Sequence, residues 1–333
     1  MSERAGVDCP VYDGCPVCGH MGKALWTEAV DREYITSGSA YKYWQCEACA
    51  SLYIDPIPEH ELALIYPKNY YSFNASASGL VDSVKLFLDK VLIHGVTSRL
   101  HGDHLSVLDI GGGSGWLLDV VKATDRRFDH SLEIDLDEDA AQVARSHGHV
   151  YWRGKFEEYP AANDRKYDLI LALNIIEHVK SPEIFMRKAR SLLSEQGRMI
   201  IKTPNVSSLD ARVFRNSYWG GLHCPRHWVL FNRTSLLQLV GRCDMALESI
   251  RFTQGAPFWC WSVLSLLADA RIVKFDALKP MYTHWLSKPL IVVFAAFDFL
   301  RMHFSPTSQM ICILRSSSQL TAGVAKDERS DTG

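Results

Sequence analysis

Between residues 104 and 315, short apolar runs typical of buried strands alternate with amphipathic stretches of helical period, and this alternation constrains the fold most strongly. The runs that predict strands are 105–110, 130–135, 149–153, 167–173, 198–203, 246–253 and 308–315. The stretches that predict helices are 114–124, 137–147 and 182–194. Strands that alternate with helices are joined by right-handed crossovers and pair in parallel. The sequence therefore predicts an α/β fold with a doubly wound, mostly parallel sheet.

The first predicted strand runs into a glycine-rich turn, in the stretch SVLDIGGGSGWLLDVV at 106–121. The glycines have the spacing Gly111-x-Gly113-x-Gly115, and Trp116 follows them. A dinucleotide-binding turn would carry Gly or Ala at position 116, and a P-loop would carry Gly-Lys-Ser/Thr, so both phosphate sites are disfavoured. Asp109 adds negative charge beside the turn, where an ammonium or sulfonium group would gain from it. The turn thus favours a zwitterionic ligand.

Asp135 lies twenty residues beyond Gly115, at the end of the second predicted strand. An acid at this position can accept hydrogen bonds from both ribose hydroxyls of an adenosine-type cofactor. Glu133 lies two residues earlier, farther from the carboxyl edge of the sheet where ligands bind. Alternatively, Asp135 is a solvent-facing acid that caps the next helix. The order of turn, strand and acid favours the ribose role.

Three segments in order, VLDIGGGSG, EIDLDEDAAQVAR and YDLILALNIIEHVKSPEIFMRKARSLLSEQGRMIIKTPN, resemble class I S-adenosylmethionine-dependent methyltransferases. A fourth, YWGGLHCPRHWVLFNRTSLLQLV, resembles the subgroup related to ubiquinone-biosynthesis O-methyltransferases. The resemblance covers about residues 104–253 and the final strand. It implies a Rossmann-like sheet of seven strands, the last of which runs antiparallel. A run of Leu-Asn-Ile at 173–175 replaces the Asn-Pro-Pro-aromatic run of amino-methylating DNA enzymes, which disfavours methylation of a base amino group.

The resemblance also implies a role for each of several cofactor-site residues. The methionyl part of S-adenosylmethionine would lie on the glycine turn and the ribose on Asp135. The adenine would be flanked by the residues after the third strand, and the methionyl amine and the methyl group would lie near the end of the fourth. The residues concerned are Gly111, Gly113, Gly115, Asp135, Lys155, Phe156 and Asn174.

Methylation of a hydroxyl requires a group that removes its proton, and the segment HCPRHWVLF offers His223 and His227, which titrate near neutral pH. The resemblance favours His227 as this base, although either residue could be a structural histidine bonded to the backbone. Glu177 and His178 raise a second hypothesis. In ubiquinone-type relatives, an acid three residues earlier joins such a pair in a metal site. Asn174 occupies that position here, so an orienting or substrate-pocket role is favoured.

Four of the nine cysteines form two C-x2-C pairs, Cys15 with Cys18 and Cys46 with Cys49. In a reducing compartment such pairs indicate a metal. Two knuckles complete the tetrahedral set of four thiolates that zinc prefers, so we expect structural zinc, with an iron-only site as the alternative. The cysteines, followed by LYIDPIPEHELALIYPKNYY, resemble the N-terminal module of some sugar and natural-product methyltransferases.

The charge balance argues against a nucleic-acid partner. Residues 1–55 carry four basic and eight acidic side chains, a net charge of −4, and the whole chain has a net charge of −2. Phosphate backbones are bound through Lys and Arg, so RNA is a weaker candidate than a small-molecule acceptor.

These patterns divide the chain into a zinc-ribbon-like module at 1–60, a linker and helical lead-in at 61–103, a methyltransferase domain at 104–315 and a polar tail at 316–333 that we expect to be disordered. An apolar stripe at helical spacing predicts the lead-in helix, through Leu80, Val81, Val84, Phe87, Leu88, Val91 and Leu92. A helical insertion at 256–305 carries FWCWSVLSLLADA and PLIVVFAAFDFLRMHF. These stretches fit a lid over a lipid-linked acceptor, a peripheral membrane contact or core helices.

No apolar run reaches the roughly 18 residues of a membrane-spanning helix, and the first residues lack a signal-peptide pattern, so we expect a cytoplasmic protein. The expected function is methylation of a hydroxyl on a small, carbohydrate or lipid-linked acceptor by S-adenosylmethionine. The alternatives are C-methylation of a sugar nucleotide, RNA methylation, and a non-catalytic cofactor-binding module that uses the ribbon for a protein partner.

Overall fold

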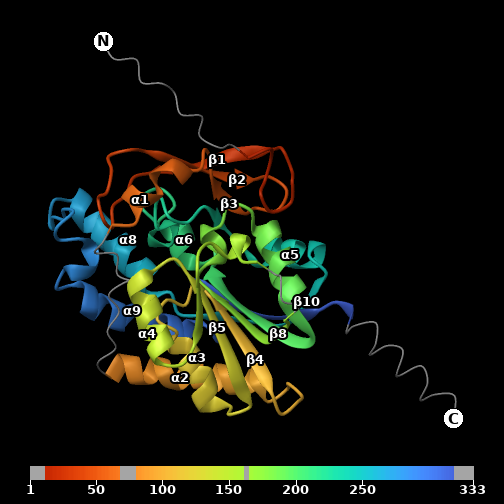
Figure 1. The fold of residues 1–333 in the computed structure, drawn as a ribbon. Coiled ribbons are helices and arrows are strands. Elements are labelled where there is room, and N and C mark those ends of the chain that lie inside the picture. The colour runs from red at the N-terminus through yellow and green to blue at the C-terminus, as the bar shows by residue number, and fades with distance from the viewer. Residues whose placement is uncertain (1–11, 68–79, 161–164, 319–333) are drawn as a thin grey trace.

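The computed structural model describes residues 12–67, 80–160 and 165–318, and within them two sheets pack into one body (Figure 1). The larger sheet contains β4 (Leu105–Ile110), β5 (Phe128–Asp135), β6 (Val150–Arg153), β7 (Tyr167–Leu173), β8 (Leu193–Pro204), β10 (Met245–Thr253) and β11 (Gln309–Ser316). Their order across the sheet is β10-β11-β8-β7-β4-β5-β6. β11 is antiparallel to both of its neighbours, and the other pairs are parallel. The predicted seven-stranded α/β fold is confirmed.

The three predicted helices form α3 (Trp116–Thr124), α4 (Glu138–Ser146) and α5 (Pro182–Leu192). Local chemistry sets where two of them begin: the Asp137 side chain accepts bonds from the first turn of α4, and Ser181 caps α5 with Pro182 at its first position. The short helix α6 (Leu209–Val213) and α7 (Arg233–Arg242) follow β8. β8 begins five residues before the predicted strand, directly after α5 ends, because Leu193 already pairs with Tyr167.

Successive residues of β4 point to opposite faces of the sheet, and both faces are covered. Leu105 and Val107 pack in a cluster with α3, whereas Leu108 and Ile110 belong to a larger cluster on the other face, which includes residues of α5 and α7. Strands buried on both sides read as continuous apolar runs, which explains the strength of the sequence signal here.

The lead-in segment forms α2 (Leu80–Thr97), as the apolar stripe predicts, but three residues of that stripe are exposed. Phe87 is 64% exposed, and Leu88 and Val91 are also exposed. Ile93 and Val96, which are not part of the stripe, are buried and pack in the cluster that contains α3. Contact with α3 near the C-terminal end of α2, rather than the sequence period of the whole segment, sets the orientation of the helix.

The smaller sheet joins the N-terminal segment to the part of the chain that forms the larger sheet. It contains β1 (Lys23–Ala29), β2 (Tyr41–Cys46), β3 (Leu52–Ile54) and β9 (Val229–Leu230), in that order. β9 lies between β8 and β10 in the sequence and pairs antiparallel with β3, Leu52 opposite Leu230. The short helix α1 (Leu62–Ile65) follows this sheet. Residues 12–60 therefore form a layer whose last strand is supplied by a distant segment.

The insertion before the last strand consists mainly of α8 (Ala256–Asp269) and α9 (Ser287–Arg301). α8 is a core helix, with Trp259, Cys260 and Leu264 buried. Asp298 of α9 is fully buried, and its carboxylate accepts hydrogen bonds from the Gly255 amide (3.0 Å) and the Trp259 indole (3.3 Å), which ties the two helices together. Within the described ranges, no helix combines the length and apolarity needed to cross a bilayer.

A buried ion pair connects the N-terminal layer to the loop that precedes β9. Arg226 Nη2 lies 2.8 Å from Asp31 Oδ2, and both side chains are fully buried. Arg226 Nε also donates to the Ile65 carbonyl (2.7 Å). Burial alone would raise the pKa of Asp31, but the Arg226 guanidinium outweighs it and holds the pKa below its usual value.

Replacement of Asp31 by Asn should destabilise the whole chain, because it leaves the Arg226 guanidinium buried without its counter-ion. We expect the free energy of unfolding to fall by about 3–5 kcal/mol, measured by urea denaturation. The matched control is Asp269→Asn, which breaks an exposed pair between Arg32 and Asp269 (2.5 Å) and should cost less than about 1 kcal/mol. Equal effects of the two substitutions would contradict the structural importance of the buried pair.

Candidate functional site

The glycine turn after β4 has a backbone that other residues cannot easily adopt. Gly111, Gly113 and Gly115 have φ angles of 77°, 65° and 77°, in the left-handed region that favours glycine. Space is also limited: a Cβ on Gly112 would lie 2.1 Å from Asp109 Oδ2, and one on Gly115 would lie 2.8 Å from His149 Cδ2. The turn is thus held closely against the side chains behind it.

Three acidic side chains converge on this turn. The Gly112 amide donates to Glu133 Oε1 (2.8 Å), and the Gly113 amide donates to Asp135 Oδ2 (3.0 Å). Asp109 Oδ2 and Glu133 Oε2 are both buried and have no hydrogen-bond partner among the described residues. The sequence places Glu133 farther than Asp135 from the ligand-binding edge. In the structure, both residues accept a hydrogen bond from the turn.

The crowding of these acids changes their protonation. Burial, and then the charge of Asp135, raises the pKa of Asp109 to about 7. Burial, and then the charges of Asp109 and Asp135, raises the pKa of Glu133 well above its usual value. A cation placed against the two partnerless oxygens would relieve this repulsion and compensate the lost hydration. We call Asp109, Glu133 and Asp135, which lie below the turn, the acidic bed. Their electrostatics favour a positively charged ligand.

Asn174 follows β7 at the same edge of the sheet, with a φ of 57°. Its amide donates to the Lys202 carbonyl (2.7 Å), and its side-chain Nδ2 donates to Glu177 Oε1 (3.1 Å). Glu177 is fully buried, its other oxygen accepts from Thr203 Oγ1 (3.0 Å), and burial raises its pKa to about 7. Ile175 packs against Gly111, so this loop adjoins the glycine turn.

Three histidines gather beside Glu177. The ring centroids of His178 and His227 are 4.7 Å apart, and those of His223 and His227 are 5.1 Å apart. His227 Nε2 lies 3.9 Å from Glu177 Oε1, so the cluster touches the Asn174 loop. Glu177, His178 and His227 have ligand atoms within 4.8 Å of one another, although His178 Nδ1 already lies 2.9 Å from the Tyr66 hydroxyl. Burial lowers the pKa of His178 to about 3.

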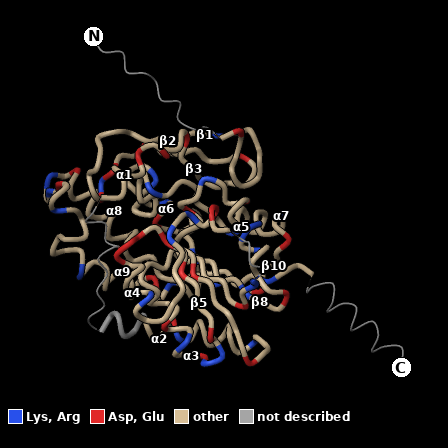
Figure 2. Tube along the Cα trace, viewed as in Figure 1, with Lys and Arg blue, Asp and Glu red and all other residues tan. Residues whose placement is uncertain are grey.

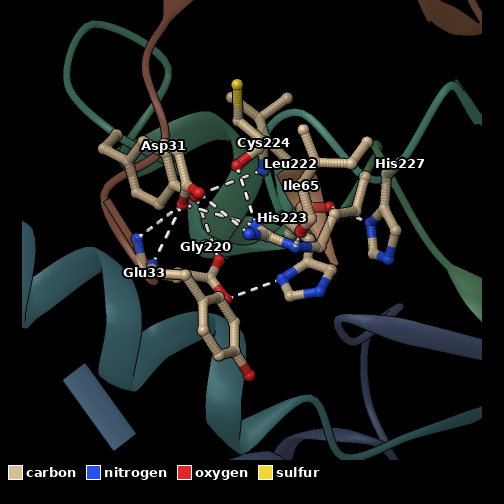
Figure 3. Close-up of polar contacts among 12 residues, drawn as sticks. Asp31, Glu33, Ile65, Gly220, Leu222, His223, Cys224 and His227 are labelled. Atoms are coloured by element: carbon tan, nitrogen blue, oxygen red, sulfur yellow. Dashed lines mark hydrogen bonds and ion pairs between the residues drawn. The ribbon is translucent and has the colours of Figure 1, made fainter. Parts of the chain in front are cut away.

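The two sequence-predicted base candidates are each oriented through Nδ1 (Figure 3). His227 Nδ1 lies 2.8 Å from the Gly221 carbonyl, and His223 Nδ1 lies 2.6 Å from Glu33 Oε2. Both acceptors require a proton on Nδ1, which leaves the lone pair on Nε2. Burial, followed by the charges of His178 and His223, lowers the pKa of His227 well below its usual value.

Glu33 belongs to the N-terminal layer and was not expected in this site. It lies in the segment between β1 and β2, is buried, and its other oxygen accepts from the Tyr218 hydroxyl (3.0 Å). It is 190 residues from its partner His223, and no local pattern in DREYI marks it as a site residue. Pairing of β3 with β9 brings the two segments together.

The remaining predicted cofactor contacts lie after β6. Phe156 is buried, and its ring packs edge-on against Phe185 with centroids 5.0 Å apart. Lys155 is exposed, with its Nζ 4.0 Å from Glu59 Oε1. Asp135, besides Gly113, accepts bonds from the amides of Leu136 (2.6 Å) and Asp137 (3.1 Å). Its carboxylate is held at the sheet edge by the backbone.

The four paired cysteines come together at the end of the smaller sheet. Sγ of Cys15 lies 3.6 Å from Sγ of Cys49, and the same distance separates Cys18 and Cys46. All four sulfur atoms lie within 4.8 Å of one another. A tetrahedral site with Zn–S bonds of about 2.3 Å would separate its sulfurs by about 3.8 Å, so the arrangement suits zinc.

Comparison with known proteins finds relatives for the part of the chain that contains the glycine turn and the histidine cluster. Residues 85–250 match the family model "Methyltransferase domain". A ubiquinone biosynthesis O-methyltransferase of Azorhizobium caulinodans is 33% identical over 107 residues, or 30% of this chain and 41% of the relative. One of Aeromonas salmonicida is 30% identical over 105 residues, 30% of this chain and 43% of the relative. The matches thus span less than half the length of these curated relatives.

Among solved structures, a coclaurine N-methyltransferase bound to N-methylheliamine and S-adenosylhomocysteine aligns with a TM-score of 0.47 at 13% identity. The alignment covers 78% of this chain and 81% of that one. The family match and the order of strands in the larger sheet lead to one conclusion: the chain contains a class I S-adenosylmethionine-dependent methyltransferase domain.

Proposed function

We propose that the protein transfers the methyl group of S-adenosylmethionine to a hydroxyl of a small acceptor, carbohydrate or lipid-linked. The observation that carries the proposal is the contact between two groups of residues. The acidic bed under the glycine turn adjoins the Asn174 loop, which in turn contacts the histidine cluster through Glu177 and His227. A cation site and candidate proton acceptors thus lie next to each other. The ubiquinone O-methyltransferases named above support hydroxyl methylation in a related domain.

In this proposal each cofactor group has a residue that receives it. The methionyl part lies on Gly111, Gly113 and Gly115, and Asp109 offsets its positive charge. Asp135 receives the ribose hydroxyls. The backbone around Lys155 and Phe156 flanks the adenine, and Asn174 lies near the methionyl amine and the methyl group.

S-adenosylmethionine supplies an activated methyl group, so the protein mainly has to align an acceptor oxygen behind it. Alignment of this kind contributes about 7–11 kcal/mol, and removal of the acceptor proton contributes about 100- to 10,000-fold in rate. With Nδ1 protonated, the neutral rings of His223 and His227 carry their lone pair on Nε2. We favour His223 as proton acceptor, since Glu33 lies 2.6 Å from its Nδ1 and stabilises the imidazolium that forms. Burial lowers the pKa of His227, which the resemblance favours, and we assign this residue to orientation of the acceptor.

We assign Glu177 and His178 to the acceptor pocket rather than to a catalytic metal, since Asn174 and Thr203 already bond the carboxylate. We also propose that Cys15, Cys18, Cys46 and Cys49 hold structural zinc in the module at 1–60. That module would act as a cap on the domain at 104–315 and supply Glu33.

The alternatives differ in the product they would give. A sugar-nucleotide C-methyltransferase would attach the methyl group to carbon, and an RNA methyltransferase would label RNA. Figure 2 shows Lys and Arg interspersed with Asp and Glu around the N-terminal sheet, which does not favour RNA. A non-catalytic module would bind the cofactor without turnover. Incubation with methyl-labelled S-adenosylmethionine and a cell extract, followed by NMR of the labelled product, distinguishes all four.

A lipid-linked acceptor is supported by the exposed side of α9 and its surroundings. Its apolar residues are Ile272, Leu278, Trp285, Val292, Val293, Phe297, Phe299, Leu300 and Phe304, each at least 40% exposed. In the same insertion, the exposed basic residues outnumber the exposed acids Asp269 and Asp276; they are Arg271, Lys274, Lys279 and Lys288. Apolar groups with nearby cations are typical of segments that lie on an anionic membrane surface. We propose that the insertion docks the protein there.

Affinity for S-adenosylmethionine should rise with pH. The cofactor carries a net positive charge near neutral pH and favours ionised carboxylates, whereas Asp109, with its pKa near 7, is largely protonated in acid. Calorimetry between pH 5.5 and 8.5 should show the dissociation constant falling by up to about tenfold per pH unit below 7, with proton release, and levelling above it. The Asp109→Asn variant should bind more weakly with a flatter profile. A pH-independent dissociation constant would contradict the acidic bed.

Substitution of the histidines should separate chemistry from binding. We expect His223→Asn to slow methyl transfer at saturating cofactor by about 100-fold or more, and His227→Asn to have a smaller effect. Both variants should bind S-adenosylhomocysteine within threefold of the parent, which calorimetry checks. Unchanged turnover in His223→Asn would remove this residue from the reaction. Failure of the folded parent to bind S-adenosylhomocysteine would overturn the proposed function.

The parent protein should sediment with vesicles of phosphatidylcholine and phosphatidylglycerol. A Val293→Asp, Leu300→Asp double variant should lose at least tenfold in partitioning, because it places charge on the docking face. The matched control is Ile184→Asp, at an equally exposed apolar position on α5, and it should sediment like the parent. Concentration-dependent dimerisation by α9 without sedimentation would show that a second copy covers this face instead.

A further inference from the structure

A second cluster of metal-binding side chains lies behind the glycine turn, apart from the histidines of the proposed active site. It consists of Asp119 on α3, His147 at the C-terminal end of α4, and His149 just before β6. Asp119 Oδ2 lies 2.6 Å from His147 Nδ1, and Asp119 Oδ1 lies 3.1 Å from His149 Nε2. One carboxylate thus faces two imidazoles from different segments.

The ligand atoms of the Asp119 cluster are close enough to share one ion. They lie within 4.8 Å of one another. With metal–ligand bonds of about 2.0–2.2 Å, two ligands of a tetrahedral zinc ion are separated by about 3.4 Å, so small side-chain movements suffice. Two histidines and one carboxylate are a set that zinc binds, with a water molecule as fourth ligand. Asp119 and His147 are 39% and 47% exposed, which leaves room for that water.

His149 has the support expected of a metal ligand. Its side chain is fully buried, and its Nδ1 lies 2.8 Å from the Ser131 hydroxyl on β5. A ligating histidine commonly uses its second ring nitrogen in a hydrogen bond, which fixes the ring orientation. With Nδ1 bonded to Ser131, Nε2 is directed towards Asp119 and His147.

We propose that Asp119, His147 and His149 form a binding site for a divalent transition metal, with zinc the best match. It is separate from the four-cysteine cluster and from Glu177, His178 and His227. Lys122 lies one turn further along α3 and repels a cation, so binding should be weaker than at the four thiolates. The site does not depend on the proposed methyl transfer.

His104 and Asp129 form a pair of the same residue types that lacks a third metal-binding side chain. His104 Nδ1 lies 2.6 Å from Asp129 Oδ2, the same distance as in the His147 pair, but both side chains are more exposed, at 85% and 56%. This pair is not among the groups of three or more metal-binding side chains found in the described residues. Substitution of His104 therefore serves as a matched control for substitution of His147.

The test uses the full chain without a polyhistidine tag, loaded with zinc and passed over a desalting column so that the four-cysteine cluster remains filled. Calorimetric titration with Zn²⁺ at pH 7.5 should show one further equivalent bound by the parent and by His104→Ala. His147→Ala and Asp119→Asn should bind that equivalent at least tenfold more weakly. Circular dichroism should show both variants folded, because the two side chains are partly exposed.

Two results would overturn the proposal. One is the absence of a further equivalent in the parent. The other is equal affinity in the parent and in folded His147→Ala, which would assign the equivalent to another group such as Glu177, His178 and His227. If His147→Ala does not fold, His147→Gln keeps a hydrogen-bond donor for Asp119 and tests the same ligand.

Discussion

The pairing of β3 with β9 is the contact on which the proposed site depends. Through it, a segment near the N-terminus lies against the loop that follows the fifth strand of the larger sheet. Asp31 then neutralises the buried Arg226, and Glu33 contacts His223. Without this pairing the loop 220–228 would have to bury an arginine and two histidines with few polar partners. The N-terminal layer therefore completes the polar interior of the site.

In the acidic bed under the glycine turn, unlike the Arg226 pair, buried polar groups lack partners among the described residues. Asp109 and Glu133 each keep one buried oxygen that no described residue bonds. Buried unpaired carboxylates weaken a fold and persist where a ligand uses them. The repulsion among Asp109, Glu133 and Asp135 agrees with the proposal that this site receives a cation. The same electrostatics would disfavour a phosphate, in agreement with the departure from the dinucleotide pattern at Trp116.

The sequence predicts well those features that short segments determine. The strands of the larger sheet and three of its helices follow from local pattern, and the fold class is predicted correctly for this reason. The roles assigned to Asp135, Phe156, Asn174 and His227 remain predictions. The residues from 68 to 79 and beyond 318, which include the end of LYIDPIPEHELALIYPKNYY and most of the polar tail, lie outside the described residues.

Long-range pairing explains what the sequence could not predict. Glu33 and Asp31 carry no local signal, and each finds its partner 190 or more residues away. The apolar stripe of α2 predicts a helix, but Phe87 and Val91 of that stripe are exposed, whereas Ile93 and Val96 outside it are buried. Likewise, the spacing of His147 and His149 does not by itself indicate a metal site. The fold is needed, because α3 places Asp119 opposite them.

The shared sheet has a consequence for how such proteins can be recombined. A ribbon that takes its fourth strand from the enzyme cannot be transplanted as a contiguous piece, because excision after residue 60 leaves β3 with an unpaired edge. The enzyme, in turn, would lose the carboxylates that its own arginine and histidine require. Working chimaeras of this architecture would therefore have to exchange the loop 218–232 together with the ribbon, and the two segments should diverge in evolution as a pair.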